Sequence, residues 1–265
     1  MSKVFQLTVL GTRGSMAACR SDSRLFGGDT SCYMVQAGEE TIFLDAGSGL
    51  ASAPAQYPKP PAILLTHLHL DHVIGLGMFP GFTVPGRRAR LYVPFCRDSA
   101  EAAEQMARVF SPPFWPLTLG DLEGKPELLP LPREFQIGEL QVEAIEGNHP
   151  NKAMILKLRF DGRCLVYATD YEHEERSFAR LIDFAKDADL LLYDAQFTEQ
   201  QYQNCRGFGH STAQKGLELM RRSGAKRLLL IHHAPASTDE ILLQRERELQ
   251  AENASYAREG EILSL

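Results

Sequence analysis

The chain has 265 residues, of which 44% are apolar, and its formal net charge is −6 at pH 7. This length and apolar content can bury a sizeable core, and we expect a single domain that spans residues 1–265. The negative charge argues against a general nucleic-acid surface, because phosphates are bound by dense basic patches. Nucleic acid is therefore not a favoured partner.

Localisation signals are missing from the pattern of apolar residues. The first ten residues lack the long apolar segment of a secretion signal, and no later stretch approaches the roughly 18 apolar residues that cross a bilayer. The five cysteines are scattered and never spaced as Cys-x-x-Cys, which argues against a disulfide framework. We expect a cytoplasmic protein with no membrane partner.

The first third of the chain contains short apolar runs that predict strands over residues 4–10, 32–37, 41–44 and 62–66. A Pro-Gly turn then precedes Arg87, Arg88 and Arg90. We interpret these arginines as a solvated turn beside a strand, with a phosphate-facing patch as the alternative.

A helix is predicted next, because Asp98 followed by Glu101 forms the pattern of a capping box. It would bury Ala102, Met106, Val109 and Phe110. The proline-rich residues 111–116 cannot continue it, and the polar stretch to about residue 134 predicts a long surface loop. Such loops are often lids, and segment 95–134 is a candidate lid here. Within it, Phe114 and Trp115 could pack in the core or stack on a substrate.

The second half continues with strands over residues 140–145, 153–160 and 163–169, the last two joined by the hairpin signal Asp161-Gly162. A helix over 174–185, a strand over 190–193, a helix over 212–222 between Ser211 and Gly224, and a strand over 227–231 follow. Strands grouped in each half, with helices entering late, predict an α/β fold of two stacked sheets that are covered outside by helices.

The strongest motif follows the fourth predicted strand and has the form His-x-His-x-Asp-His. A tight loop there can direct three imidazoles and one carboxylate into one pocket, a ligand set that suits zinc, manganese or iron. One ion cannot easily use all four groups, whereas two ions about 3.5–4 Å apart can. The motif therefore predicts a binuclear metal site that begins with His67, His69, Asp71 and His72.

Further ligands are expected where other predicted strands end. His149 follows the strand over 140–145, Asp170 follows the strand over 163–169, and His232 follows the strand over 227–231. Each of these residues alone would more often be a turn or cap residue. Together, and beside the histidine motif, they favour a second set of metal ligands.

With these residues, the sequence resembles the metallo-β-lactamase superfamily, and within it the branch that includes ribonuclease Z and the cyclic-phosphate phosphodiesterases. The resemblance covers almost the whole chain and implies a four-layer αβ/βα sandwich of two mixed sheets. Besides the histidine motif, it rests on Leu10–Ser15, Gly27–Cys32, Phe43–Gly47, His149-Pro150, Thr169-Asp170, Asp194–Phe197, Gly209–Thr212 and Leu230–His232.

The resemblance also implies a division of the ligands between two divalent ions, most simply zinc, with manganese or iron as alternatives. Asp170 would bridge the ions, and His233 is a rival for the position assigned to His232. The first ion would be held by His67, His69 and His149, and the second by Asp71, His72 and His232.

The resemblance further implies a role for His210, because this branch places that histidine beside the substrate phosphate. His210 would be the general acid, and Asp71 would steer the proton of the nucleophile as well as bind metal. Asp194 would orient His210, although ribonuclease Z usually has the longer glutamate there, which leaves its reach in question. Asp29 replaces a common asparagine, and Asp45 would support the metal loop.

The expected reaction is hydrolysis of a small cyclic phosphate or nucleotide by a hydroxide that bridges the metals. Two alternatives are a transfer-RNA 3′-processing nuclease, whose protruding basic arm we do not find, and a thioester or lactam hydrolase, which the Gly209–Thr212 segment disfavours. A flavin-linked di-iron oxidoreductase would need a further domain, and a non-catalytic module would have lost ligands. The sequence leaves a homodimer open.

Overall fold

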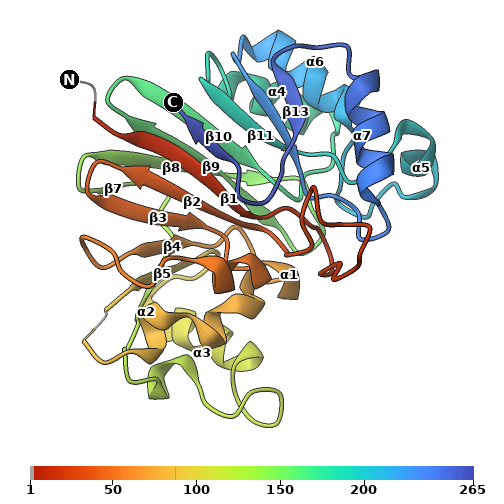
Figure 1. Cartoon of the computed structure of the whole chain (residues 1–265). Coiled ribbons are helices and arrows are strands. Elements are labelled where there is room, and N and C mark those ends of the chain that lie inside the picture. Colours follow the sequence, from red (N-terminus) through yellow and green to blue (C-terminus); the bar gives the residue numbers. More distant parts are fainter. Residues whose placement is uncertain (1–2, 87) are drawn as a thin grey trace.

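The computed structural model describes residues 3–86 and 88–265 and contains two sheets of seven strands, packed face to face with helices on both outer faces (Figure 1). This architecture confirms the expected four-layer αβ/βα sandwich. Arg87 lies outside the described residues, so the predicted arginine patch can be followed only in part. Within it, Arg90 pairs with Glu40 at 3.9 Å.

The first sheet has the strand order β14-β1-β2-β3-β4-β5-β6. The strands β3 to β6 run parallel to one another, whereas β1, β2 and β14 pair antiparallel. Its strands are β1 Phe5–Gly11, β2 Cys32–Ala37, β3 Glu40–Leu44, β4 Ala62–Leu64, β5 Arg90–Val93, β6 Glu127–Pro130 and β14 Ile262–Ser264.

The second sheet has the order β13-β12-β11-β10-β9-β8-β7, and β10 to β13 are parallel. The hairpin between β9 and β10 turns at Asp161 and Gly162, whose φ angles of 49° and 77° confirm the predicted two-residue turn. Its strands are β7 Glu134–Ile137, β8 Leu140–Gly147, β9 Ala153–Phe160, β10 Arg163–Ala168, β11 Leu190–Asp194, β12 Leu228–Ile231 and β13 Ala254–Tyr256.

Helices cover the two outer faces. The α-helices are α1 Leu70–Val73, α2 Pro80–Thr83, α3 Ser99–Val109, α4 Glu175–Phe184, α5 Glu199–Asn204, α6 Ala213–Ser223 and α7 Asp239–Glu248, and the 3-10 helices are η1 Ser48–Ser52, η2 Ile74–Met78 and η3 Leu119–Asp121. In Figure 1, α1 to α3 lie on the side of the first sheet and α4, α6 and α7 on the side of the second. Among the described residues, no helix is long and apolar enough to cross a membrane.

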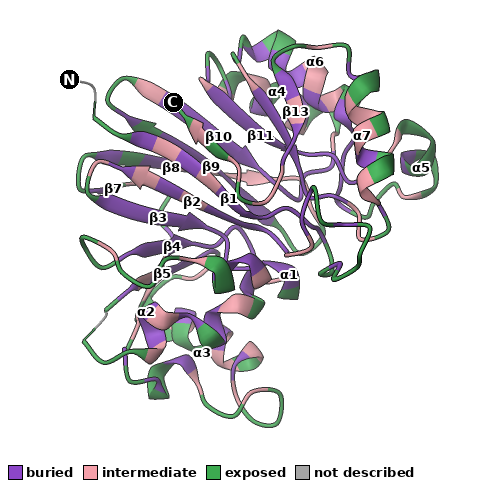
Figure 2. Ribbon diagram, viewed as in Figure 1, coloured by how far each residue is buried: buried purple, intermediate pink, exposed green. Residues whose placement is uncertain are grey.

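The stacking of helices, sheet, sheet and helices creates three layers of apolar core. Apolar side chains of both sheets meet between them, for example Leu7 and Val35 with Leu156 and Leu192. Two outer layers lie between each sheet and its helices. Strands buried on both faces read as continuous apolar runs, which is why the sequence predicts β4, β10 and β12. The labelled strands β4 and β10 are mostly coloured as buried in Figure 2.

Two helix caps differ in detail from the sequence predictions. Asp98 caps α3 and accepts from the Glu101 backbone N–H at 2.9 Å, but the Glu101 carboxylate pairs with Arg97 rather than completing the capping box. Helix α6 is capped by Thr212 instead of Ser211, and it ends as predicted at Gly224, whose φ of 75° suits glycine.

The predicted long loop to residue 134 is wrong in its second part, because β6 lies within it. Strand β6 joins the edge of the first sheet next to β5, with Tyr92 opposite Leu129. Partial burial gave β6 no clear alternation of apolar and polar residues, so the sequence offered little signal for it. The strands β5, β7, β13 and β14 and the helices α5 and α7 were also not predicted.

Candidate metal and catalytic site

One edge of the first sheet carries the histidine motif. Strands β3 and β4 are parallel, so the residues that follow them meet at the same edge. Asp45 comes directly after β3, and His67 comes three residues after the end of β4. His69 is the N-cap residue of α1, a single turn that carries Asp71 and His72 back toward Asp45.

The second sheet presents its own residues at the facing edge. Strand β8 runs parallel to β10, because both pair antiparallel with β9, and parallel strands end on the same side. His149 follows β8, Asp170 follows β10, Asp194 ends β11 and His232 follows β12. His210 reaches this edge from the loop that precedes α6. The fold therefore brings all the predicted ligands together.

The first group consists of His67, His69, His149 and Asp170, whose ligand atoms all lie within 4.8 Å of one another. Oδ1 of Asp170 is 3.6 Å from Nε2 of His67 and 3.8 Å from Nε2 of His149. Nδ1 of His69 faces the same His149 nitrogen at 3.3 Å. Burial lowers the pKa of each of these three imidazoles, which keeps them neutral, as metal ligation requires.

The second group consists of Asp71, His72, Asp170 and His232. Oδ2 of Asp170 is 3.0 Å from Nε2 of His72 and 3.1 Å from Nε2 of His232. Oδ2 of Asp71 is 3.2 Å from the same His232 nitrogen. Asp170 thus directs one oxygen to each group, which is the arrangement expected of a bridging carboxylate.

The electrostatics of these groups suit a bound cation. Burial opposes ionisation of Asp170, yet the imidazoles of His232, His72 and His67 hold its pKa well below the usual range. Among the described residues, buried Nε2 of His67 has no hydrogen-bond partner, although buried nitrogens normally have one. Convergent lone pairs and an orphaned ring nitrogen fit divalent metal ions, so the residues present suit the expected cofactor.

Backbone strain is concentrated at this edge. Asp45, Asp170 and His232 have φ angles of 57°, 47° and 61°. Residues with side chains rarely adopt this left-handed conformation, and where they do, the strain often marks a functional site. In this chain it aims each side chain from the end of a strand into the space between the sheets.

The tautomers of three imidazoles are set by hydrogen bonds from Nδ1. His72 bonds to Oδ2 of Asp45 at 2.7 Å, His149 to the carbonyl of Gly209 at 2.9 Å, and His67 to the Thr66 hydroxyl at 3.0 Å. A ring that donates from Nδ1 presents the lone pair of Nε2 to a metal.

Two supports were missed by the sequence reasoning. Glu172 is buried and accepts the backbone N–H groups of Gly207 and Gly209, which places the Gly209 carbonyl against His149. Tyr167 donates to Asp45 at 2.8 Å from the second sheet. Neither residue belongs to a local motif, because each contact joins residues that are distant in sequence.

His210 and Asp194 are in direct contact, with Nδ1 of the ring 2.8 Å from Oδ2 of the carboxylate. The aspartate therefore reaches the histidine in spite of its short side chain. Burial disfavours a charged ring, but Asp194 and then Asp170 overcome it and raise the pKa of His210 to about 9. Asp194 also lies 3.5 Å from Nδ1 of His232, so it connects His210 to the second group.

The structure distinguishes His232 from its neighbour. Nε2 of His233 donates to the carbonyl of Ala257 at 2.8 Å, and His233 belongs to none of the metal-competent groups among the described residues. Burial lowers the pKa of His233 to about 3. The geometry therefore favours His232 at the ligand position.

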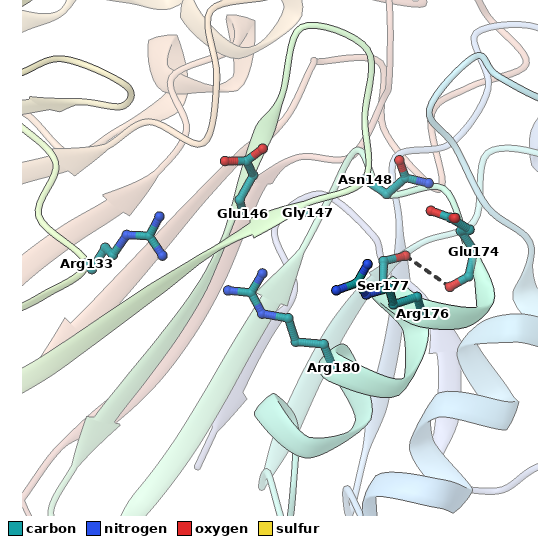
Figure 3. A pocket seen from close by; sticks show the side chains of 8 residues that line it. All are labelled: Arg133, Glu146, Gly147, Asn148, Glu174, Arg176, Ser177 and Arg180. Carbon is teal, nitrogen blue, oxygen red and sulfur yellow. Dashed lines mark hydrogen bonds between the residues drawn. The ribbon is translucent and has the colours of Figure 1, made fainter.

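Two cavities flank the loop that carries His149. One has a volume of about 420 Å³ and is lined by His67 and His69. The other, of about 640 Å³, lies between β8 and α4, and Figure 3 shows Arg133 and Arg180 pointing into it below Glu146.

Phe114 and Trp115, the predicted candidates for stacking on a substrate, lie outside the cavity beside His67 and His69. Phe114 is 82% exposed, and Trp115 packs against Phe110 with ring centroids 5.6 Å apart. Neither lines the cavity beside His67 and His69. Core packing is therefore the role that the structure gives to Trp115, and the lid role of segment 95–134 stays a prediction.

Comparison with known proteins identifies the family. The model of the β-lactamase superfamily domain matches residues 40–233, which is most of the chain. The chain therefore belongs to the β-lactamase superfamily, as the motifs predicted, and it is a hydrolase of the metallo-β-lactamase fold.

Individual relatives agree with this assignment. Ribonuclease Z from Archaeoglobus fulgidus is 24% identical, with 86% of this chain and 87% of the relative covered. The probable metallo-hydrolase YhfI from Bacillus subtilis is 25% identical over 86% of each chain.

Solved structures show the same fold. The crystal structure of YhfI superposes with a TM-score of 0.77 at 18% identity and covers 99% of this chain and all of the other. A diphosphatase from the PhnP family has a TM-score of 0.70 at 19% identity, with 100% and 98% covered.

Proposed function

We propose that this protein is a binuclear metal-dependent phosphodiesterase that holds two zinc ions and acts on a small cyclic phosphate or nucleotide. The observation that carries the proposal is the position of Asp170, which directs one carboxylate oxygen to each of two ligand groups. The relatives named ribonuclease Z and the PhnP-family diphosphatase support phosphorus–oxygen bonds as the reacting class.

The ions would be held by His67, His69 and His149 on one side and by Asp71, His72 and His232 on the other, with Asp170 shared. When bound, they would supply an activated water at neutral pH and polarise the phosphate oxygens. Asp71 accepts the backbone N–H of Ser15 at 2.6 Å, which fixes its carboxylate toward the ligand groups. We assign to Asp71 the additional role of receiving the proton of the attacking water.

His210 would act as the general acid. Its Nδ1 is tied to Asp194, while Nε2 has no hydrogen-bond partner among the described residues and can meet a phosphate ester. Asp194 favours the protonated ring, so His210 can give a proton to the leaving oxygen or stabilise the charge on phosphorus-bound oxygens.

The test uses bis(p-nitrophenyl) phosphate with protein loaded with zinc or manganese. The variants Asp71→Ala and Asp170→Ala should lose at least a hundredfold in kcat/KM, and the wild type should bind about two metal ions per chain. Asp183→Ala, at an exposed position of α4, is the matched control and should retain full activity. Undiminished hydrolysis by metal-loaded Asp170→Ala would contradict the assignment.

The arginine-lined cavity in Figure 3 supports a second candidate, a ribonuclease. Arg133, Arg176 and Arg180 line it together with Asn148, the neighbour of His149, and none of the three arginine side chains has an ion-pair partner among the described residues. A chain of phosphates could pass from the metals into this cavity.

To distinguish the two candidates, cleavage of a short single-stranded RNA is compared in the wild type and in Arg133→Glu/Arg180→Glu. A ribonuclease should lose about tenfold or more in RNA cleavage and keep its turnover of bis(p-nitrophenyl) phosphate, which is too small to need both regions. Equal RNA cleavage by both proteins would exclude the use of this cavity. A parallel panel of thioesters and lactams tests the remaining alternative on this fold.

A further inference from the structure

The cavity of about 420 Å³ beside the metal ligands has the features of a specificity pocket. His67 and His69 form one wall, so a substrate whose phosphate lies at the metals would reach directly into it. The volume is within the range of small-molecule sites. Leu68 belongs to the same wall, and the remaining walls come from three separate segments and consist of Pro94, Phe95, Gln105, Asn151 and Lys152.

Phe95 provides an aromatic surface at the mouth of this cavity. It follows β5, which is parallel to β4, so the turn that carries Phe95 lies at the same sheet edge as His67. Phe95 is 36% exposed, and its φ angle is 58°. A bulky residue in this conformation is a clear outlier, and such strain clusters at ligand clamps.

The opposite wall is strained in the same way. Asn151 and Lys152 have φ angles of 62° and 71° in the turn that follows His149. This turn is held in place because the Lys152 N–H donates to the carbonyl of His149 and the Met154 N–H to that of Thr66, both at 2.9 Å. Two strained turns therefore face each other across the cavity.

The charge in this cavity comes from Lys152. Its ammonium lies 5.6 Å from the centroid of the Phe95 ring and 3.7 Å from the Glu146 carboxylate. Both contacts are loose and exposed, so the ammonium can turn toward a ligand at little cost. Lys152 thus places an exposed cation beside an aromatic face, in the cavity that His67 and His69 also line.

An amide completes the lining. Gln105 projects from the middle of α3, is partly buried, and makes no hydrogen bond to the described residues. A glutamine amide offers both a donor and an acceptor, and it can pair with the edge of a purine or pyrimidine base.

We propose that this cavity binds the nucleoside part of a nucleotide substrate, with the base stacked on Phe95, the base edge bonded to Gln105 and a phosphate oxygen paired with Lys152. The inference rests on the proposed phosphodiesterase function and narrows its substrate class to nucleotides. It assigns to Phe95 the role that the sequence suggested for Phe114 or Trp115.

The test compares two ligands that differ only in the base, adenosine 5′-monophosphate and ribose 5-phosphate. Their affinities for the zinc-loaded protein are measured by titration calorimetry, which does not depend on turnover. We expect the nucleotide to bind about tenfold more tightly than the sugar phosphate, because stacking of one base on an aromatic ring contributes on that order.

Variants separate the contributions of the two residues. Phe95→Leu should remove most of the preference for the nucleotide, whereas Phe114→Leu, which alters an exposed phenylalanine outside the cavity, should keep it. Lys152→Gln should weaken both ligands by a similar factor, because both carry the phosphate. Circular dichroism checks that each variant is folded.

Equal affinities of the wild type for the two ligands, or a full preference retained in Phe95→Leu, would overturn the proposal. If the proposed phosphodiesterase function were wrong and the nucleoside site were right, the result would differ. The wild type would then bind adenosine 5′-monophosphate more tightly than ribose 5-phosphate and yet hydrolyse no phosphodiester.

Discussion

Asp45 shows how much of the geometry of this site depends on a residue that is not itself a proposed ligand. Its carboxylate is fully buried and accepts hydrogen bonds from the Thr66 backbone and hydroxyl, from Tyr167 and from His72. These donors come from both sheets, so the carboxylate fixes the start of the metal loop and the orientation of His72 at once. Partners of this kind are often as necessary for metal affinity as the ligands.

We therefore predict that Asp45→Asn lowers metal affinity by about 10–100-fold, because the amide loses the charge that holds the His72 N–H. Competition with a fluorescent chelator measures the change. Tyr167→Phe removes only one of the donors to the same carboxylate and should cost less than about fivefold. Equal affinities of Asp45→Asn and the wild type would show that His72 needs no support.

At the same scale, the proposed role of His210 as a proton donor depends on Asp194. Replacement of Asp194 by asparagine removes the charge that raises the pKa of His210, so the ring should be neutral at pH 7. Cleavage of a dinucleotide, whose alkoxide leaving group needs a proton, should fall by about 10²–10⁴. Bis(p-nitrophenyl) phosphate releases a stable phenolate and should lose less than tenfold. Equal losses for the two substrates would indicate that His210 does not act as an acid.

At the scale of elements, the sequence predicted those strands that directly precede a ligand. Strands β4, β10 and β12 are nearly continuous apolar runs, and each is followed within three residues by a proposed ligand. The edge strands β6 and β14 are only partly buried, and α7 is mostly charged. Their placement depends on tertiary contacts, which local patterns do not contain.

The difference between local patterns and tertiary contacts also separates the site residues that the sequence predicted from those that it missed. The proposed ligands belong to short motifs with fixed spacing, so the family resemblance predicted residues that the structure brings together. Glu172 and Phe95 instead contact residues that are distant in sequence, Glu172 with Gly209 and Phe95 with Lys152. A single sequence carries no signal for such pairs.

The contact between Glu259 and the backbone of Asp29 should make the free energy of unfolding depend on pH. Glu259, between β13 and β14, accepts the Asp29 backbone N–H at 2.6 Å. Burial, and to a smaller extent the charge of Asp29, raise the pKa of Glu259 to about 7. The unfolded chain releases this proton near pH 4.3. The native state thus binds more protons between these values, and the free energy of unfolding should fall as pH rises through this window.

Glu259→Gln removes this contribution. Urea unfolding of the metal-free protein at pH 5 and pH 8 should show that the wild type loses on the order of 1 kcal/mol more than the variant between the two pH values, with solvent screening taken into account. The site histidines titrate in both proteins, so the difference isolates Glu259. The same pH dependence in both proteins would place the pKa of Glu259 near its ordinary value.

At the scale of the whole molecule, the proposed ligands are divided between the two sheets. His67, His69, Asp71 and His72 follow the first sheet, whereas His149, Asp170 and His232 belong to the second. Each ion would therefore join both halves of the sandwich. Without metal, the convergent imidazoles and carboxylates are left buried or half-buried, which costs free energy in the folded state.

Zinc should consequently stabilise the entire fold. At a free concentration 100-fold above the dissociation constant, one site contributes about 2.7 kcal/mol, and two sites contribute more. For a chain of this size, the thermal midpoint should rise by about 5–10 °C or more. Differential scanning fluorimetry of stripped and zinc-loaded protein measures the shift, with magnesium as a control because it binds imidazole weakly.

The position of the proposed ligands in both sheets also predicts how many unfolding transitions this experiment shows. If the ions join the sheets, and if residues 1–265 form a single domain, both halves should unfold in one transition with and without zinc. His69→Ala should lose part of the zinc-dependent shift, whereas His233→Ala should keep that shift even if its own baseline stability is lower. A zinc-loaded protein whose midpoint equals that of the stripped protein would contradict a metal site that spans the two sheets.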